Sequence, residues 1–368
     1  TVILRTSAIL FMHLSFFRSP SSGGSFDEPN DPNRGDVHYW EVWHGNKPFS
    51  EYRKYFFRYA SEFGFQSFPS VKTLETVTDD PKELNPFSYV MEKHQRNYGG
   101  NGKIAKYMQA AYRYPENFSD FVYASQLLQA DGIRYGVEHY RRNRGRCMGA
   151  IYWQLNDCWP VISWSSIDYY GRWKALHYYA KRFFAPVMLS CEEQSWMTVE
   201  ADMNRQHFEF EKSIRLNVTN ETLDAHRVLV KWAVRKTDAT ILREEEQWLE
   251  VPALSAVWMD KVELPQIDCF NEYVSYEAWE NDQIISQGTV IFSYPKYFRY
   301  LNPGLTVRVD GDEIVVKAEA YAKSVEIRNE NDDLILEDNY FDMNAGEYRV
   351  KILDGKPDGL KVRSVYDI

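Results

Sequence analysis

The chain has 368 residues and a formal net charge of −10 at pH 7, with 44% hydrophobic and 16% aromatic residues. The negative balance excludes nucleic acid as a partner, because no basic patch is present to release counterions from phosphates, and it favours neutral ligands. The length predicts two or three domains. The aromatic share suits either a large core or a site that stacks on sugar rings.

Four cysteines occur, at positions 147, 158, 191 and 269. None forms a Cys-x-x-Cys pair, and no histidine lies nearby at metal-ligand spacing, so we expect no metal and no cofactor. The absence of a disulfide pattern favours a reducing, cytoplasmic compartment, with secretion, periplasm or lysosome as the alternatives.

The first segments of the chain show no strong fold signal. Residues 1–17 are fairly apolar but too short and interrupted to span a membrane, so we expect no membrane partner and interpret the start as a truncation. Residues 19–36 are rich in Ser, Pro, Gly, Asn and Asp and predict a loop at the mouth of a cleft. Residues 37–43 alternate around aromatic residues and predict a strand that Gly45 breaks.

Glu62 lies among aromatic and small residues and predicts the end of a buried strand that faces a cleft. A buried, unpaired carboxylate is costly, so Glu62 needs either a partner, such as Arg58, or a function. Gly64 leaves room for another group to approach the backbone. Gln66 and Ser67 could hydrogen-bond the carboxylate or a sugar hydroxyl.

The interval between Glu62 and Trp153 is too long for one strand–helix unit and predicts several helices. The third of them begins at an Asn117 or Ser119 cap, and an arginine cluster after it predicts a solvated face at the helix C-terminus. Asn156 and Asp157 end the next strand. The expected helices are 82–97, 102–113, the one starting at 117 or 119, and 172–184; the strand is 148–155; the arginines are Arg141, Arg142, Arg144 and Arg146.

After Pro186 the pattern changes to short strands with a period of two, separated by turns, which is typical of β-sandwiches. Two sets are separated by a linker over 295–303. The first set is 196–200, 214–218, 228–235, 246–251 and 272–279; the second is 305–309, 313–320, 324–329 and 347–352. Neither set carries a catalytic constellation.

Three motifs occur in order: Gly35–Gly45, the segment around Glu62, and Met148–Tyr178. Together they resemble the β-mannosidases of glycoside hydrolase family 2, closely over roughly residues 19–190 and more loosely beyond. The resemblance implies an α/β plus all-β fold. Residues 1–186 would form the C-terminal half of a (β/α)8 TIM barrel, followed by Ig-like β-sandwiches over 187–295 and 296–368.

The resemblance also implies roles for individual residues. Glu62 matches the family's nucleophile, and Trp153 matches the tryptophan that forms the floor of the sugar-binding subsite. His44 matches a position that faces the sugar, although an ordinary loop histidine is an equal alternative. The further candidates for substrate binding are Trp43, Asn156 and Asp157.

A retaining glycosidase needs a second carboxyl group as acid/base, about 5–5.5 Å from the nucleophile. In the family this glutamate follows an asparagine upstream of the nucleophile, and no Asn-Glu pair precedes Glu62 here. We interpret Asp36, Glu41, Asp157 and Asp168 as orienting groups. We therefore expect part of a barrel with an open sheet edge, exposed apolar side chains and no meaningful activity on its own.

Three functions compete. In the complete enzyme the chain would take part in the retaining hydrolysis of terminal non-reducing β-D-mannose, so that a mannoside or oligosaccharide is the expected partner. A related exo-glycosidase acting on glucosaminides, galactosides or glucuronides, and a non-catalytic sugar-binding protein, are the alternatives. Nothing in the sequence indicates the oligomeric state.

Overall fold

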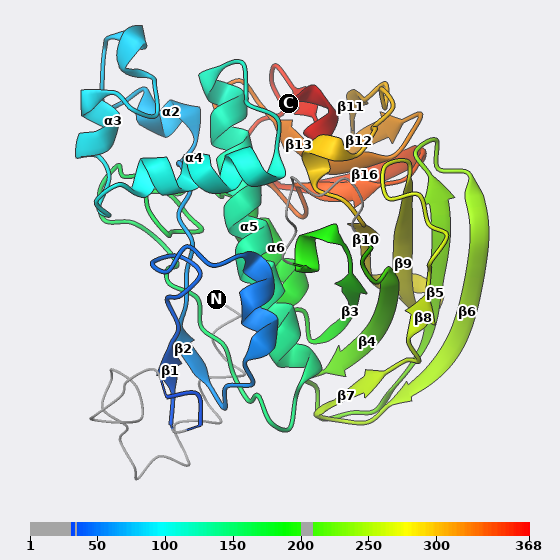
Figure 1. The fold of residues 1–368 in the computed structure, drawn as a ribbon. Helices are drawn as coiled ribbons and strands as arrows, with labels where there is room; N and C mark the ends of the chain where they lie inside the picture. The colour runs from blue at the N-terminus through cyan, green and yellow to red at the C-terminus, as the bar shows by residue number, and fades with distance from the viewer. Residues whose placement is uncertain (1–30, 34, 200–208) are drawn as a thin grey trace.

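The computed structural model describes residues 31–33, 35–199 and 209–368 (Figure 1). The apolar opening at 1–17, most of the loop expected at 19–36, and Glu200 lie outside the described residues. Within the described ranges, no helix combines the length and apolar character needed to cross a bilayer.

The long helix α5 (Phe118–Arg142) stands at the centre of the molecule (Figure 1). It begins where predicted, because the Asn117 side chain accepts a 3.0 Å hydrogen bond from the Asp120 amide. Its buried residues lie on nearly every face. Around it pack η1 (Phe49–Lys54), α4 (Gly100–Ala111) and α6 (Ala175–Phe183). Helices α4 and α6 correspond to those predicted over 102–113 and 172–184.

The prediction of one helix over 82–97 is wrong. The chain forms η2 (Pro81–Glu83) and α3 (Tyr89–Lys93) instead, after the short α2 (Val71–Leu74). Pro86 lacks an amide hydrogen and interrupts the ladder. The Ser88 side chain then caps a new helix by accepting a 3.2 Å hydrogen bond from the Met91 amide.

Three segments run parallel beside α5: β1 (Val37–His38), β2 (Ala60–Glu62) and residues 149–153. The Ala60 amide donates to the Gly149 carbonyl at 3.0 Å, and Ile151 and Trp153 donate back to Ala60 and Phe63 at 2.8 Å. The strands expected over 37–43 and 148–155 are wrong in extent. After His38 the chain coils into a turn, and 148–155 pairs with β2 only through an isolated bridge at Ala150.

The strands between Val187 and Ile291 form a sandwich of two antiparallel sheets, ordered β3-β4-β7 and β10-β9-β5-β6. Inward-facing apolar residues on alternate positions, among them Val228, Val230 and Val274, fill its core. The strand predicted at 196–200 is the short η3 (Trp196–Thr198), because the Ser195 side chain caps a turn there. The strands are β3 (Val187–Gln194), β4 (Ser213–Asn220), β5 (His226–Lys236), β6 (Ile241–Val251), β7 (Ser255–Trp258), β8 (Val262–Glu263), β9 (Glu272–Glu280) and β10 (Gln283–Ile291).

After the linker turn η4 (Pro295–Tyr297), the C-terminal module forms sheets ordered β11-β12-β16-β14 and β15-β13-β17. Its core is continuous with that of the helical part. The Tyr123 hydroxyl donates to the Ser324 carbonyl at 2.6 Å, and the Tyr178 and Tyr340 rings lie 5.8 Å apart. The elements are β11 (Thr306–Asp310), β12 (Glu313–Ala318), β13 (Ala322–Arg328), β14 (Ile335–Leu336), β15 (Phe341–Met343), β16 (Gly346–Asp354), β17 (Lys361–Arg363) and η5 (Val365–Asp367).

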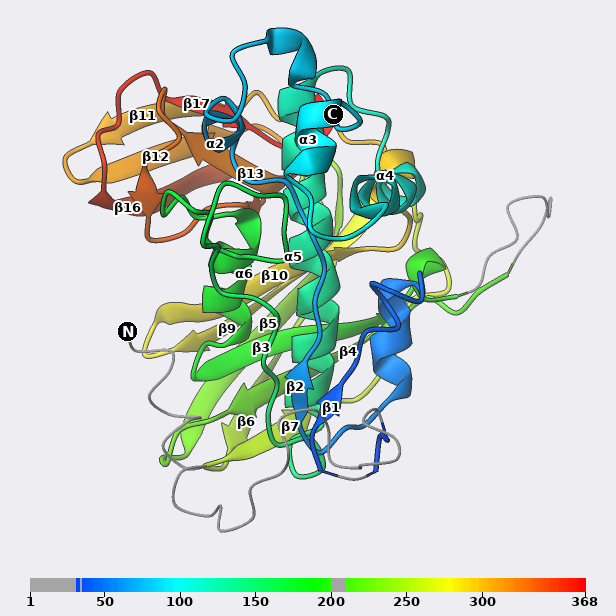
Figure 2. The ribbon, with the colours of Figure 1, turned by 90° about the vertical axis from the view of Figure 1, so that its left-hand side faces the viewer.

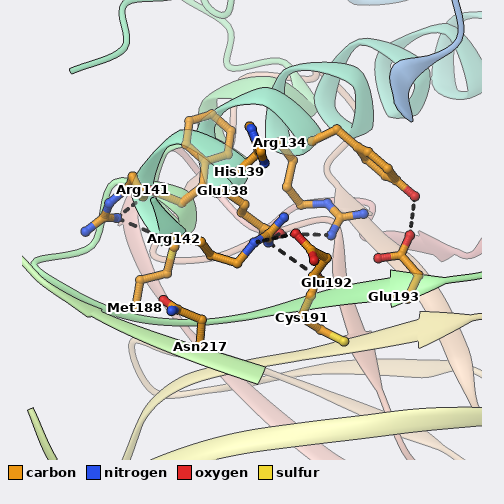
Figure 3. Close-up of polar contacts among 12 residues, drawn as sticks. Arg134, Glu138, His139, Arg141, Arg142, Met188, Cys191, Glu192, Glu193 and Asn217 are labelled. Carbon is orange, nitrogen blue, oxygen red and sulfur yellow. Dashed lines mark hydrogen bonds and ion pairs between the residues drawn. The ribbon is translucent and has the colours of Figure 1, made fainter. Parts of the chain in front are cut away.

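Buried charges join α5 to the first sandwich. Figure 2 shows α5 lying across β3 and β4, and Figure 3 shows Arg142 and Glu138 pointing from α5 toward Cys191 and its neighbours on β3. Arg142 is 1% exposed and donates to the Glu138 carboxylate and the Cys191 carbonyl, each at 3.4 Å. The prediction of a solvated arginine face is therefore wrong for Arg141 and Arg142, because the sandwich packs against this end of the helix.

Candidate functional site

The Glu62 carboxylate lies at the end of β2 and is held from one side by residues of the segment that contains β1. The Trp40 indole nitrogen donates to its Oε2 atom at 3.3 Å, and His38 Nδ1 lies 3.3 Å from the same oxygen. The Glu62 side chain is 27% exposed, so it can also meet a ligand. In the described part of the chain no hydrogen bond or ion pair joins it to Arg58, the partner considered from the sequence.

His38 and Trp40 were not singled out from the sequence as site residues. The signal was available, because positions 38 and 40 share one face of the strand expected over 37–43. The parallel register places His38 opposite Glu62. The Trp40 ring is supported by Trp164 at 6.1 Å and by His44 at 5.3 Å between ring centroids.

Trp153 lies on the neighbouring segment, beside the end of β2. Its amide donates to the Phe63 carbonyl at 2.8 Å, and the residue is 44% exposed. Gly64 permits this approach, since a Cβ atom there would lie 2.5 Å from the Trp153 carbonyl oxygen and 2.9 Å from the Trp40 ring. The close backbone approach predicted at Gly64 is therefore present, and Glu62, Trp40 and Trp153 converge on it.

Apolar side chains on the segment around Trp153 are exposed. Ile151, Trp153 and Leu155 are 51%, 44% and 49% exposed, and Met148 is 48% exposed. These exposed side chains agree with the exposed apolar side chains expected at an open sheet edge.

Gln66 and Ser67 do not reach the Glu62 carboxylate. Both are fully buried, and the Ser67 hydroxyl donates to Gln129 on α5 at 2.6 Å. Beyond Gly64 the chain enters the core, where Phe65 and Phe68 pack, so this part of the predicted hydrogen bonding is wrong.

The two aromatic candidates at 43 and 44 are placed very differently. Trp43 is fully buried, edge-on to Phe65 at 5.0 Å and to Trp164 at 6.1 Å, so it packs behind the site and has no face open to a ligand. His44 is exposed and adjoins Trp40. Partial shielding of the ring and the positive charge of Lys103 lower the pKa of His44.

Asp157 is buried behind the Trp153 segment. It accepts hydrogen bonds from Ser163 at 2.9 Å, from Ser165 at 2.6 Å and from the Gln154 amide at 3.2 Å. Burial raises its pKa, although the nearby Lys174 charge and the two serines oppose the shift. Asp157 therefore fixes the loop that follows Trp153, whereas Asn156 beside it is exposed.

Lys174 is a further buried charge that sequence reasoning missed. It is 1% exposed, and its Nζ donates to the Ser67 carbonyl at 3.2 Å and the Ser163 carbonyl at 3.4 Å. Burial lowers its pKa to about 8, against the attraction of Asp157 and Asp168. It thus ties the Glu62 segment to the loop after Trp153.

Of the other carboxylates proposed as orienting groups, Glu41 is exposed, whereas Asp36 and Asp168 are held in hydrogen bonds. Asp36 accepts a 2.5 Å hydrogen bond from Ser61, the residue before Glu62, whose side chain leaves the opposite face of the strand. Asp168 accepts from Thr73 at 2.5 Å and from the Arg172 amide at 3.0 Å. Within the ranges that the structure covers, no three His, Cys, Asp or Glu side chains gather as a metal site, and the four cysteines are free thiols.

Known proteins resemble both β-modules and the chain as a whole. A Mannosidase Ig/CBM-like domain matches residues 212–297, and an Ig-fold domain of mannosidases matches residues 300–368. The crystal structure of a β-D-mannosidase from Dictyoglomus thermophilum covers 99% of this chain with a TM-score of 0.81 and 27% identity. The chain resembles the C-terminal portion of family 2 β-mannosidases.

Curated relatives agree. A β-mannosidase B of Thermothelomyces thermophilus is 29% identical in an alignment 366 residues long that covers 92% of this chain and 42% of that protein. A β-mannosidase of Capra hircus is 35% identical in an alignment 184 residues long that covers 46% of this chain and 21% of that protein. The β-mannosidase-like chain thus spans less than half the length of these relatives. An exo-chitosanase of Amycolatopsis orientalis, at 17% identity and a TM-score of 0.57, shares the fold.

Proposed function

We propose that this chain supplies the nucleophile and part of the sugar subsite of a retaining exo-β-mannosidase that removes terminal non-reducing β-D-mannose. The observation that carries the proposal is the Glu62 carboxylate, partly exposed at the end of a parallel strand and oriented by Trp40 and His38. The exposed Trp153 beside it offers an apolar face for a sugar ring.

Each neighbouring residue then has a distinct task. Glu62 attacks the anomeric carbon, while the Trp40 N–H and His38 hold its carboxylate in one orientation. Trp153 stacks on the sugar, and the exposed His44 and Asn156 can reach its hydroxyls. Asp157 acts from behind by fixing the loop after Trp153.

The architecture we propose for the complete enzyme follows from the strand arrangement. Residues 1–186 would contribute the C-terminal half of a (β/α)8 barrel, supported by the parallel order of β1, β2 and residues 149–153. The two sandwich domains would be 187–295 and 296–368. The acid/base carboxyl would come from outside this chain, since Asp36, Asp157 and Asp168 are held in other hydrogen bonds.

Covalent trapping tests the nucleophile. A protein that carries this chain together with the upstream barrel strands is incubated with a 2-deoxy-2-fluoro-β-mannosyl fluoride, which accumulates the glycosyl-enzyme. Peptide mass spectrometry should place the label on Glu62. Glu62→Gln should lose the label and the turnover, whereas Glu92→Gln, an exposed carboxylate on α3, should keep both.

A panel of nitrophenyl glycosides tests the sugar. β-Mannoside should be preferred over β-glucosaminide, β-galactoside and β-glucuronide. A label on another carboxylate, or near-normal turnover by Glu62→Gln, would overturn the nucleophile. Preference for another glycoside would move the assignment to a related exo-glycosidase, and binding of mannose without turnover would indicate a sugar-binding protein.

A further inference from the structure

Trp164 is linked to both tryptophans of the proposed sugar site. Its ring lies 6.1 Å from the ring of Trp40, the residue that bonds Glu62. Its carbonyl accepts a 3.1 Å hydrogen bond from the amide of Gln154, which directly follows Trp153. A shift of Trp164 would therefore move the other two site tryptophans.

The two serines on either side of Trp164 are held by one buried carboxylate. Ser163 and Ser165 donate to the same oxygen of Asp157, Oδ2, at 2.9 Å and 2.6 Å, and all three residues are buried. The Gln154 side chain donates to the other oxygen, Oδ1, at 3.2 Å. Asp157 thus fixes both flanks of Trp164 together with the segment that begins at Gln154.

Lys174 holds the same segment through the backbone. Its Nζ donates to the Ser163 carbonyl at 3.4 Å and to the Ser67 carbonyl at 3.2 Å. The Ser67 amide donates to the Ser163 carbonyl at 3.0 Å, and the Lys174 amide donates to the Ser166 carbonyl at 2.9 Å. Ser163 is therefore fixed at its hydroxyl by an anion and at its carbonyl by a cation.

The two charges are kept at a cost in stability. Lys174 is 1% exposed, and among the described residues it forms no direct ion pair, although Asp157 and Asp168 attract it. Burial lowers the pKa of Lys174 to about 8 and raises the pKa of Asp157, so both charged forms are disfavoured relative to water. Packed apolar side chains would avoid this cost. Buried charges of this kind gather at functional sites, which favours a task at the site over a task in stability.

We propose that Asp157 and Lys174 act together as positioning residues for the sugar site, and that neither touches the substrate. The two charges hold residues 163–165, and the indole in the middle of that segment, Trp164, sets the places of the other two site tryptophans. This inference rests on the function proposed for Glu62.

Fluorine-19 NMR of the 368-residue chain labelled with 5-fluorotryptophan tests the positioning without activity. The resonances of all three site tryptophans, assigned by replacing each in turn with phenylalanine, should shift in Lys174→Met and in Asp157→Asn. The resonance of Trp248 on β6 of the sandwich should stay. Both replacements remove a charge and nearly keep the size of the side chain, so the fold should persist.

A milder change tests the same link. Ser163→Ala/Ser165→Ala removes the hydroxyls that bond Asp157 and should shift the same resonances. The matched control Ser213→Ala removes a buried hydroxyl of the sandwich that bonds Glu211 at 2.5 Å, and it should shift none of the three. Site resonances that move no further in the charge and serine variants than in Ser213→Ala would overturn the proposal.

Kinetics of the complete enzyme, which includes the upstream barrel strands, test the consequence for the sugar site. With nitrophenyl β-mannoside, Lys174→Met and Asp157→Asn should each lower kcat/KM by roughly 10–100-fold, up to the loss that a misplacement of about 1 Å produces. The double variant should lose less than the product of the two losses, because each single variant leaves the other charge uncompensated. Losses that multiply, or near-normal kcat/KM in both single variants, would overturn the proposal. Near-normal turnover by Glu62→Gln would instead overturn the function proposed for that residue, and the NMR result would still decide the positioning.

Discussion

The buried Arg53–Glu193 pair tests how the helical part is held against the sandwich. Glu193 is 4% exposed and Arg53 is 12% exposed, and the Arg53 guanidinium donates to the Glu193 carboxylate at 2.7 Å. The Tyr135 hydroxyl donates to the same carboxylate. Glu193→Gln keeps the shape of the side chain and removes its charge, so Arg53 loses its ion-pair partner while it lies near the buried Arg142.

The structure sets the expected magnitude. Removing one partner of a buried ion pair costs about 3–5 kcal/mol, because the surviving charge stays desolvated and unpaired. The Arg227–Glu250 pair is a matched control, since these side chains are 65% and 75% exposed at 3.4 Å. Exposed pairs contribute about 0.2–1 kcal/mol, so Glu250→Gln should change the free energy of unfolding by no more than that.

Urea unfolding followed by circular dichroism at several pH values measures both variants. Burial raises the pKa of Glu193, but the Arg53 charge and the Tyr135 hydrogen bond outweigh it, and the net pKa lies below the usual range. A carboxyl with a lowered folded-state pKa stabilises the protein above its unfolded pKa of about 4.3, and this stability is lost as the pH falls through the folded-state value.

The difference between the parent chain and Glu193→Gln should therefore be complete at pH 7 and shrink below about pH 4. A loss at pH 7 no larger than that of Glu250→Gln would show that the pair contributes no more than an exposed one. A difference that stays constant down to pH 3 would show that the Glu193 charge is not its cause.

The remaining predictions concern the proposed sugar site. In the complete enzyme Glu62→Gln should lower kcat by orders of magnitude with an unchanged circular dichroism spectrum; near-normal kcat contradicts the nucleophile. Trp153→Ala should lower kcat/KM by roughly tenfold or more, the equivalent of about 1.4 kcal/mol of lost contact, and Trp153→Phe should restore part of it; equal values in both variants contradict stacking. The 368-residue chain alone should hydrolyse nitrophenyl β-mannoside at least ~10²–10⁴-fold more slowly than an intact relative, because general acid help is missing; comparable turnover would mean that a carboxylate such as Asp157 serves as the acid. Burial lowers the pKa of Lys174 to about 8, below its unfolded value, so this residue destabilises the fold at lower pH and its penalty fades as the pH rises above 8. The stability of the parent relative to Lys174→Met should therefore rise between pH 8 and 10, and a flat difference would contradict the buried charge.

The sequence alone determined the features that depend on local chemistry. Asn117 caps α5 because its side chain competes for an amide three residues away, a signal that lies within one turn of helix. Eight predicted strands appear in the order expected, because period-two alternation reflects a core that a strand meets with one face: β4, β5, β6, β9, β11, β12, β13 and β16. The sequence did not indicate β3 or β10, nor the short strands β7, β8, β14, β15 and β17. Gly64 was recognisable as a point of close approach because glycine alone lacks a Cβ.

Only the tertiary structure decided what surrounds these elements. Whether Arg142 is solvated depends on β3, which lies some fifty residues further along the chain and covers it. Trp43 and Trp153 have the same chemistry, yet one is enclosed by α4 and Trp164 whereas the other lies exposed beside β2. The partners of Glu62 came from the parallel strand β1 and the residues just after it, so their identity required the register of that pairing. Burial and strand register are properties of packed segments, and a single stretch of sequence does not contain them.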